Sequence, residues 1–346
     1  MIKKRTLRNL ILSLAIGVLG GLSLTQQVQA DTQSQNSDFE IQPITPEGQI
    51  DASKNYYDVE YKPGSTHTIE MRIQNFTNHK ITVKSELQNG MTQQGGGLKY
   101  QTATSGLDES LRRPLTTFAS VEKADRILHL GPNETTVIQA HIKMPNEKFS
   151  GVIAGSWHFI EYLNNGKNNS QSVSSNYAYE TGIILRGSHY KVYPELKYDS
   201  SGPILVDNRP AMGIKLRNTQ AMLLKKVHVK AVVTKKGLFS DKRLFENSDT
   251  SIAPNSSVVL PVAWNYDDMK PGKYEVAVKV TGENLWNKLP MTWTFKKTFK
   301  ISKKSAMAIN KKAIQRPSNK WLYAFTASGV MLLVAAASLY KVTKLG

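Results

Sequence analysis

The sequence predicts an all-β ectodomain of two immunoglobulin-like β-sandwich domains in series, with an N-terminal signal peptide and one C-terminal transmembrane helix. Three observations lead to this fold class. The central part of the chain alternates apolar and polar residues in short runs broken by Gly, Pro and Asn. One succession of strand and turn signals occurs twice, and an uncharged apolar segment stands near each end.

The N-terminus is typical of a secretory signal peptide. Residues 1–8 carry four Lys and Arg, an apolar stretch covers residues 10–24, and Val28 and Ala30 are small residues where a signal peptidase cuts. We expect residues 1–30 to be the signal peptide, with cleavage after Ala30. The body that follows is then exported.

The body consists of short runs with a period of two residues, rich in β-branched side chains. This pattern indicates strands with one wet face and one buried face, and many short antiparallel strands favour sandwiches. Helical periodicity of useful length is missing from the body. The clearest strand signals lie at 67–73, 80–87, 136–144, 152–160, 226–233 and 273–280.

A weak internal repeat divides the body into two domains. Each half contains a strand ending in Asn, a polar turn and a second strand, followed by a Pro-Asn turn with its strand and a Gly turn with its strand. In the first half these segments are 73–83, 131–145 and 149–155, and in the second half they are 216–229, 253–264 and 270–278. We expect domains at 31–188 and 189–302. A long insertion, 88–124, interrupts the first, and loops of this length are usually functional or disordered.

The C-terminus is predicted to anchor the chain. Residues 321–340 contain no charged side chain and are bounded by Lys320 and Lys341. A helix of this length is roughly 30 Å long, the thickness of the hydrocarbon core of a bilayer. We expect a basic stalk at 303–319, a transmembrane helix at 320–341 and a cytoplasmic tail at 342–346. The protein is then a single-pass protein of the cell membrane, with its ectodomain on the extracellular face within the cell wall.

Composition restricts the partners of the body. The net charge of +18 is uneven: residues 31–188 hold 14 Lys and Arg against 17 Asp and Glu, whereas residues 189–305 hold 21 against 10. Because the body is exported, we expect no nucleic acid but an acidic wall polymer, an acidic protein or anionic lipid, unless the lysines are simply solvated. The chain has no cysteine, so packed cores must stabilise it.

The sequence contains no catalytic signature. Its seven histidines are scattered singly, and no zinc-hydrolase spacing, nucleophile elbow or phosphate-binding loop is present. We therefore predict no enzyme activity, no catalytic residues, no metal and no cofactor. A Ser-His-Asp arrangement assembled only by the fold stays open.

Several strings resemble one family of Gram-positive cell-surface proteins, the WxL-interacting proteins. They are FEIQPITPEGQID (39–51), MPNEKFSGVIAG (144–155), YAYETGIILR (177–186), RPAMGIKLRNTQAMLL (209–224), MKPGKYEVAV (269–278), WTFKKTFKI (293–301) and the C-terminal apolar segment. The resemblance implies an N-terminal domain that binds peptidoglycan and a C-terminal domain that binds a host ligand or a WxL surface protein. The WxL motif belongs to the partner, and this chain contains no Trp-x-Leu.

Binding candidates follow from exposed aromatic and basic residues. In the first domain we expect a glycan site, with the insertion as an exposed platform, because aromatic rings near turns can stack on sugars. In the second domain, Trp286 lies between turn signals, and interface anchors are enriched in Trp and Arg. The glycan-binding candidates are Tyr56, Tyr57, Tyr100, Arg112 and Arg113; the partner-binding candidates are Trp286, Lys235, Lys236, Lys242 and Arg243.

These features favour a non-enzymatic cell-surface scaffold that binds peptidoglycan and recruits a WxL surface protein or an extracellular ligand. One alternative is a membrane-anchored adhesin whose basic domain binds host matrix directly. Another is a cell-wall hydrolase or its regulatory subunit.

Overall fold

The computed structural model describes residues 37–162, 177–237, 240–314 and 331. The predicted signal peptide, the cytoplasmic tail and all of the predicted transmembrane helix but Met331 lie outside these residues. Within the described ranges, no helix is long and apolar enough to cross a membrane.

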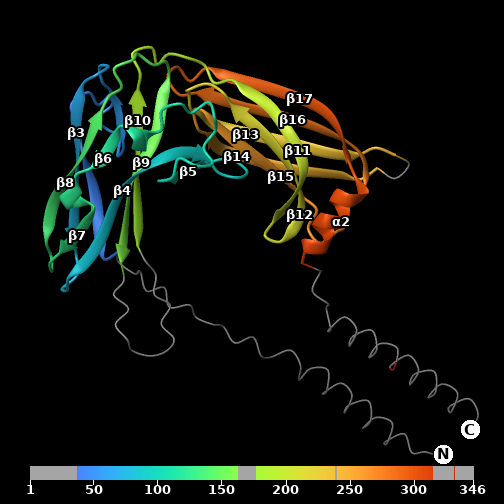
Figure 1. Ribbon diagram of the computed structural model, residues 1–346, viewed down its shortest axis with the longest axis horizontal. Helices are drawn as coiled ribbons and strands as arrows, with labels where there is room; N and C mark the ends of the chain where they lie inside the picture. The colour runs from blue at the N-terminus through green and yellow to red at the C-terminus, as the bar shows by residue number, and fades with distance from the viewer. Residues whose placement is uncertain (1–36, 163–176, 238–239, 315–330, 332–346) are drawn as a thin grey trace, which may run out of the picture. The chain divides into compact units, whose positions relative to one another are not determined.

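The first β-sandwich consists of two sheets, each of which contains blue and green strands in Figure 1 because the chain passes repeatedly from one sheet to the other. All of its described strand pairs are antiparallel except β2 with β10. One sheet has the order β1 (Phe39–Ile44), β3 (Thr66–Asn75), β8 (Thr135–Lys143), β6 (Ala119–Val121). The other has the order β2 (Tyr57–Glu60), β10 (Ala178–Arg186), β9 (Val152–Tyr162), β4 (Ile81–Thr92), β5 (Leu98–Gln101), with β7 (Ile127–Leu130) also on β4.

The core of this sandwich lies between the two sheets. Trp157 and Phe159 are fully buried, and the Trp157 Nε1 donates to Ser85 Oγ at 2.8 Å, so the indole nitrogen keeps a partner inside the core. On the outer side of the second sheet, Arg186 donates to both carboxylate oxygens of Asp58, at 2.6 and 2.8 Å, and both side chains are buried. Alternating side chains therefore separate an apolar core from an outer face that carries polar groups.

The second β-sandwich has seven antiparallel strands and runs from yellow to red in Figure 1. A sheet of three strands packs face to face on a sheet of four strands, as in immunoglobulin-like sandwiches of seven strands. The fourth strand of this domain in chain order lies in the four-stranded sheet. The first sheet has the order β11 (Leu196–Val206), β12 (Arg209–Asn218), β15 (Ser256–Ala263). The other has the order β14 (Lys242–Ile252), β13 (Leu224–Lys235), β16 (Gly272–Asn284), β17 (Pro290–Ile301). The prediction of two β-sandwiches in series is confirmed.

The internal repeat has a physical basis in two buried asparagines. Asn75 ends β3, and its side-chain amide donates to Gly131 O at 2.6 Å. Asn218 ends β12, and its amide donates to Ala253 O at 3.0 Å. Each accepting carbonyl immediately precedes a Pro-Asn turn whose Asn is left-handed, with φ of 54° at Asn133 and 45° at Asn255. The asparagine and its turn thus stabilise each other in both sandwiches.

The segment expected to be a free stalk begins with a helix docked on the second sandwich. Helix α2 (Lys303–Lys312) starts at an N-cap, Ser302, and buries Ala306 in the second core. The Asn310 side chain exchanges hydrogen bonds with the backbone of Met269 at 2.9 and 3.1 Å. The residues from 303 to 312 therefore belong to the second sandwich rather than to a stalk.

Candidate functional site

Tyr56 and Tyr100 come together on the outer face of the sheet that contains β10. Gly182, on β10, lies between them: a Cβ on this glycine would be 3.8 Å from the Tyr56 Cβ and 3.9 Å from the Tyr100 hydroxyl. Tyr100 is paired with Gly90 on β4, which adds no side chain beneath the ring. A Cβ on Gly182 would make only ordinary contacts with both residues, and Tyr56 also packs against the apolar cluster that contains Val152 and Ile184. The sequence alone did not show this convergence. We call the surface formed by Tyr56, Tyr100, Gln88, Ser156, His158, Glu180 and Gly182 the tyrosine face.

The tyrosine face carries hydrogen-bonding groups beside its two rings. Ser156 Oγ donates to Glu180 Oε1 at 2.9 Å, and His158 Nδ1 lies 3.9 Å from the same oxygen. This buried His158 nitrogen has no hydrogen-bond partner in the described part of the chain. Burial, together with the charge of Glu180, raises the pKa of Tyr100 to about 12, so its hydroxyl stays protonated at neutral pH. Aromatic surface next to donors and acceptors is the chemistry that a sugar requires.

The prediction for Tyr57 is wrong. Its side chain is 1% exposed in the first core, beside Trp157, and its hydroxyl donates to Glu70 O. Tyr57 is the first residue of β2 and, like Val59 two positions further on, points into the core. Tyr57 therefore cannot stack on a glycan.

The insertion is not the exposed platform that the sequence suggested, because its first part docks on the second sandwich. Gly95 N donates to Val259 O and Gly97 N to Ser251 O, both at 2.8 Å. All three glycines of residues 95–97 have positive φ, and a Cβ on Gly96 would lie 2.8 Å from the Thr250 side chain. Only glycine permits this close backbone approach.

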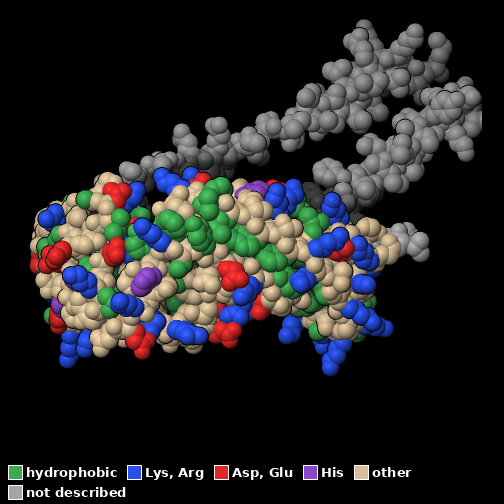
Figure 2. Space-filling view, turned by 90° about the horizontal axis from the view of Figure 1, so that it is seen from above, with side chains coloured by type: hydrophobic (Ala, Val, Ile, Leu, Met, Phe, Trp, Pro, Cys, Tyr) green, Lys and Arg blue, Asp and Glu red, His purple; other side chains and the backbone are tan. Residues whose placement is uncertain are grey.

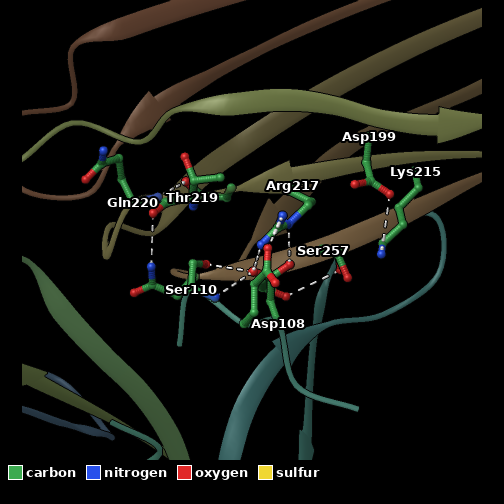
Figure 3. A network of polar contacts seen from close by, with 12 residues as sticks. Asp108, Ser110, Asp199, Lys215, Arg217, Thr219, Gln220 and Ser257 are labelled. Atoms are coloured by element: carbon green, nitrogen blue, oxygen red, sulfur yellow. Dashed lines mark hydrogen bonds and ion pairs between the residues drawn. The ribbon is translucent and has the colours of Figure 1, made fainter. Parts of the chain in front are cut away.

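A second part of the insertion holds an arginine of the other sandwich. Arg217, on β12, donates to both carboxylate oxygens of Asp108 at 2.8 and 2.7 Å and lies 2.7 Å from Glu109 (Figure 3). Burial works against the Asp108 charge, but hydrogen bonds from Arg217 and Ser110 outweigh it and lower the pKa of Asp108. This carboxylate is thus a fixed anion that joins the two sandwiches.

Trp286 is packed rather than exposed. The indole is half-buried, and its Nε1 donates to Val192 O at 2.8 Å. It contacts a small apolar cluster whose buried members are Val152, Ala154, Ile184 and Met222. Because Val152, Ala154 and Ile184 belong to the first sandwich, Trp286 belongs to the junction between the sandwiches, and the prediction that it is exposed is wrong.

The basic partner-binding candidates do lie together, at the turn between β13 and β14. Figure 2 shows Lys and Arg side chains gathered toward this end of the second sandwich. Lys242 is exposed, and Lys236 forms an exposed ion pair with Glu275 at 3.0 Å. Arg243 is different: it donates to Asp241 and Asp267 at 3.0 Å and lies over the Trp264 ring. Arg243 is therefore a structural cation rather than a free one.

Two clefts are lined by candidate residues. The base cleft, of about 620 Å³, lies beside α2, and its charged lining is balanced between Lys235, Arg243, Lys270 and Asp241, Asp267, Asp268. The junction cleft, of about 360 Å³, contains Arg112 and Arg113, so the structure places these two candidates away from the tyrosine face. Within the described residues, no group of three or more His, Asp or Glu could hold a metal ion.

Comparisons with known proteins identify two family domains. The peptidoglycan binding domain of the WxL Interacting Protein family matches residues 39–161, and the host binding domain of the same family matches residues 168–311. By pairing with β9, β10 (residues 178–186) nevertheless belongs to the first sandwich. No curated protein matches the chain.

Among solved structures, the chain is similar to three chaperones. The YadV chaperone is 11% identical over 77% of this chain and 100% of its own, with a TM-score of 0.34. The class 5 fimbriae chaperone CfaA is 11% identical over 74% and 98%, with a TM-score of 0.33. The E. coli chaperone DraB is 12% identical over 76% and 96%, with a TM-score of 0.31.

Proposed function

From the premise that this chain belongs to the WxL-interacting protein family, we propose that it is a non-enzymatic scaffold of the cell surface. The first sandwich binds peptidoglycan, and the second recruits a WxL surface protein or an extracellular ligand. The observation that carries this proposal is the presence of both binding domains of the family in one chain, in sequence order.

The tyrosine face is the surface that we assign to the glycan. Tyr56 and Tyr100, both partly buried, bring aromatic rings to this face for the apolar side of a sugar, while the exposed Glu180 carboxylate and the partly buried Gln88 amide bring an acceptor and a donor for its hydroxyl and amide groups. Apart from Tyr56, which immediately precedes β2, the residues of this face lie on strands, so they are held in place before the glycan arrives.

Tyr100→Ala should weaken binding of the full-length protein to purified peptidoglycan about tenfold, and Tyr56→Ala by a similar or smaller factor. An aromatic ring buried by a ligand contributes roughly 1.5–3 kcal/mol, and about 1.4 kcal/mol corresponds to a factor of ten. Pelleting with insoluble peptidoglycan measures the effect. Phe76→Ala is the matched control, because Phe76 is an exposed aromatic residue of the same sandwich outside the tyrosine face. Equal losses in all three variants would refute the assignment.

The lysines at the β13–β14 turn are the surface that we assign to the protein partner of the second sandwich. Replacing Lys235, Lys236 and Lys242 with Glu should slow association and reduce its salt dependence, since surface charge mainly affects encounter rates. Surface plasmon resonance against a WxL-domain protein measures this. Arg243 is left intact in this variant, because its ion pairs stabilise the fold. An unchanged association rate would remove the turn from the interface.

The adhesin alternative keeps its support in the matched host binding domain and in the excess of Lys and Arg over residues 189–305. Parallel binding measurements with host matrix proteins and with a WxL-domain protein distinguish the two partners. The hydrolase alternative predicts release of soluble muropeptides from peptidoglycan, and we expect none.

The signal peptide and the transmembrane helix complete the proposal. They hold the two sandwiches outside the membrane, within the wall. Protease added to wall-stripped cells should then remove most of the body between Asp31 and the membrane. Full protection of the body would reverse the topology.

A further inference from the structure

The junction cleft has a wall from each sandwich. The first sandwich contributes the end of the insertion and the loop before β9, and the second contributes the turn after β12 together with Asn255. Ser110 and Thr219, which stand on these two walls, are labelled in Figure 3. A ligand in this cleft therefore contacts both domains at once. Its lining residues are Ser110, Leu111, Arg112, Arg113, Lys148, Phe149, Ser150, Ile153, Thr219, Gln220, Ala221 and Asn255.

The charge of this lining has one sign. Arg112, Arg113 and Lys148 are its charged residues, and no carboxylate lines the cleft. Among the residues that the structure describes, neither Arg112 nor Lys148 forms an ion pair, and Arg113 pairs only with Glu147, an outlying carboxylate that is 81% exposed. The base cleft, by contrast, neutralises its three cations with three aspartates. Uncompensated cations in a concave site attract an anion.

Opposite the cations, Thr219 Oγ1 and one amide N–H of Gln220 already donate to Glu195, at 3.1 and 3.4 Å, so the group there that can still donate to an oxyanion is the second N–H of each amide. Thr219, Gln220 and Asn255 bring one hydroxyl and two amides to the wall of the second sandwich. They are anchored locally, since Thr219 donates to Glu195 Oε2 at 3.1 Å and Asn255 Nδ2 donates to Thr219 O at 3.1 Å. This wall adds neutral hydrogen-bonding groups to the charges of the first sandwich.

The position of the cations depends on the docking of the two sandwiches. Ser110 N and Oγ donate to Asp108 at 3.0 and 2.7 Å, and Asp108 is held by Arg217 of the other sandwich. The chain reaches Arg112 two residues after Ser110. The cleft is thus formed by the same contacts that join the domains, and an anion bound there would strengthen the junction.

We propose that the junction cleft binds a free carboxylate of the peptide part of peptidoglycan. The proposal rests on the proposed function, because the peptidoglycan-binding domain brings this polymer to the protein and its peptides carry carboxylates. The tyrosine face then contacts the glycan, while Arg112, Lys148 and the polar wall of the second sandwich contact an acidic group. Peptidoglycan binding consequently involves the host binding domain as well.

The test compares native peptidoglycan with peptidoglycan whose carboxylates have been converted to amides by carbodiimide coupling, both freed of teichoic acids. The full-length protein in mild detergent is pelleted with each. Arg112→Gln/Lys148→Gln should bind native peptidoglycan about tenfold to a hundredfold more weakly than the unmodified protein, since hydrogen bonds to charged groups are the stronger ones. On the amidated polymer the two proteins should bind alike.

The control variant Lys80→Gln/Lys123→Gln removes two exposed lysines of the first sandwich outside the cleft and should bind native peptidoglycan normally. Equal binding of native and amidated polymer by the unmodified protein overturns the proposal, as does normal binding by the cleft variant. A third measurement uses peptidoglycan that still carries its teichoic acids. If the cleft variant binds more weakly than the unmodified protein only to this polymer, the cleft binds phosphate, and the proposal that it binds a carboxylate is refuted.

The same experiment distinguishes failure of the cleft assignment from failure of the proposed peptidoglycan-binding function. If the proposed function fails, the unmodified protein does not pellet with native peptidoglycan at all. If only the cleft assignment fails, the unmodified protein and the cleft variant pellet equally, while Tyr100→Ala still loses binding. Thermal unfolding of each variant checks the fold, and no change is expected because Arg112 and Lys148 are exposed.

Discussion

The interiors of the two sandwiches and the junction between them are held by different kinds of contact. Each interior is a continuous apolar core, with Trp157 at the centre of one and Trp264 in the other. The junction has a small apolar cluster together with backbone hydrogen bonds, the Asp108–Arg217 pair and side-chain hydrogen bonds such as those that join Thr92 to Ser256 and Ala253. Burial stabilises a domain without fixing direction, whereas hydrogen bonds require defined geometry. We therefore infer that the cores stabilise the domains and that the junction orients them.

Damage to the buried ion pair on the outer side of the first sandwich should have the largest effect. Asp58→Ala leaves the buried Arg186 guanidinium without its carboxylate, and breaking a buried ion pair on one side typically costs about 3–5 kcal/mol. Chemical denaturation followed by intrinsic tryptophan fluorescence measures the loss. The double variant Asp58→Ala/Arg186→Met removes both charges and should recover part of the stability. A loss below about 1 kcal/mol for Asp58→Ala would contradict the role of this pair.

Damage to the backbone of the junction comes next. Gly151 has φ of +80°, and a Cβ there would lie 2.0 Å from Ala221 O, so Gly151→Ala should separate the sandwiches locally. We expect the unfolding transitions of the two sandwiches, measured by calorimetry, to move apart. Gly106→Ala is the matched control: its φ is +82°, but nothing lies within 4 Å of the added Cβ. Identical behaviour of the two variants would show that only backbone strain matters.

Arg217→Ala should have a smaller effect confined to the junction. Hydrogen bonds to charged groups contribute roughly 1.5–3 kcal/mol, and two of them are lost with this side chain. Hydrogen exchange at the amides of residues 95–97 should speed up while the cores stay protected. Lys215→Ala, which breaks an exposed pair with Asp199 at 3.5 Å in the same region (Figure 3), should change little. Faster exchange throughout the second core would mean that Arg217 stabilises the fold rather than the junction.

Acidification should have the mildest effect. The pKa of Asp108 is lower in the folded protein, so its contribution is complete above the ordinary Asp value of about 4 and is lost as pH falls through the lowered value. The protection of the amides of residues 95–97, measured relative to their intrinsic exchange rates at each pH, should therefore fall at acidic pH, and Asp108→Asn should reduce this pH dependence. An identical pH profile in the variant would exclude Asp108 as the titrating group.

Periodicity and turn chemistry were sufficient to predict the fold class and its clearest strands. Alternating residues mark a strand because one of its faces is buried, and the Asn75 and Asn218 turns repeat because each half encloses one core. The same period could have placed Tyr57 in the core together with Val59. The helix Lys303–Lys312 was missed because only Ala306 is buried along it, which leaves almost no apolar stripe to detect.

What the sequence determined by itself is thus local: strands, turns, the two apolar end segments and the uneven charge. Only the tertiary structure decided which distant residues meet. It placed Tyr56 and Tyr100 about Gly182, turned the insertion onto the second sandwich, packed Trp286 into the junction and left Arg112 beside Lys148. The physical reason is the distance along the chain over which each interaction acts. Strand and turn preferences depend on a few neighbouring residues, whereas a binding surface depends on sheet order and domain docking, which pair residues more than a hundred positions apart.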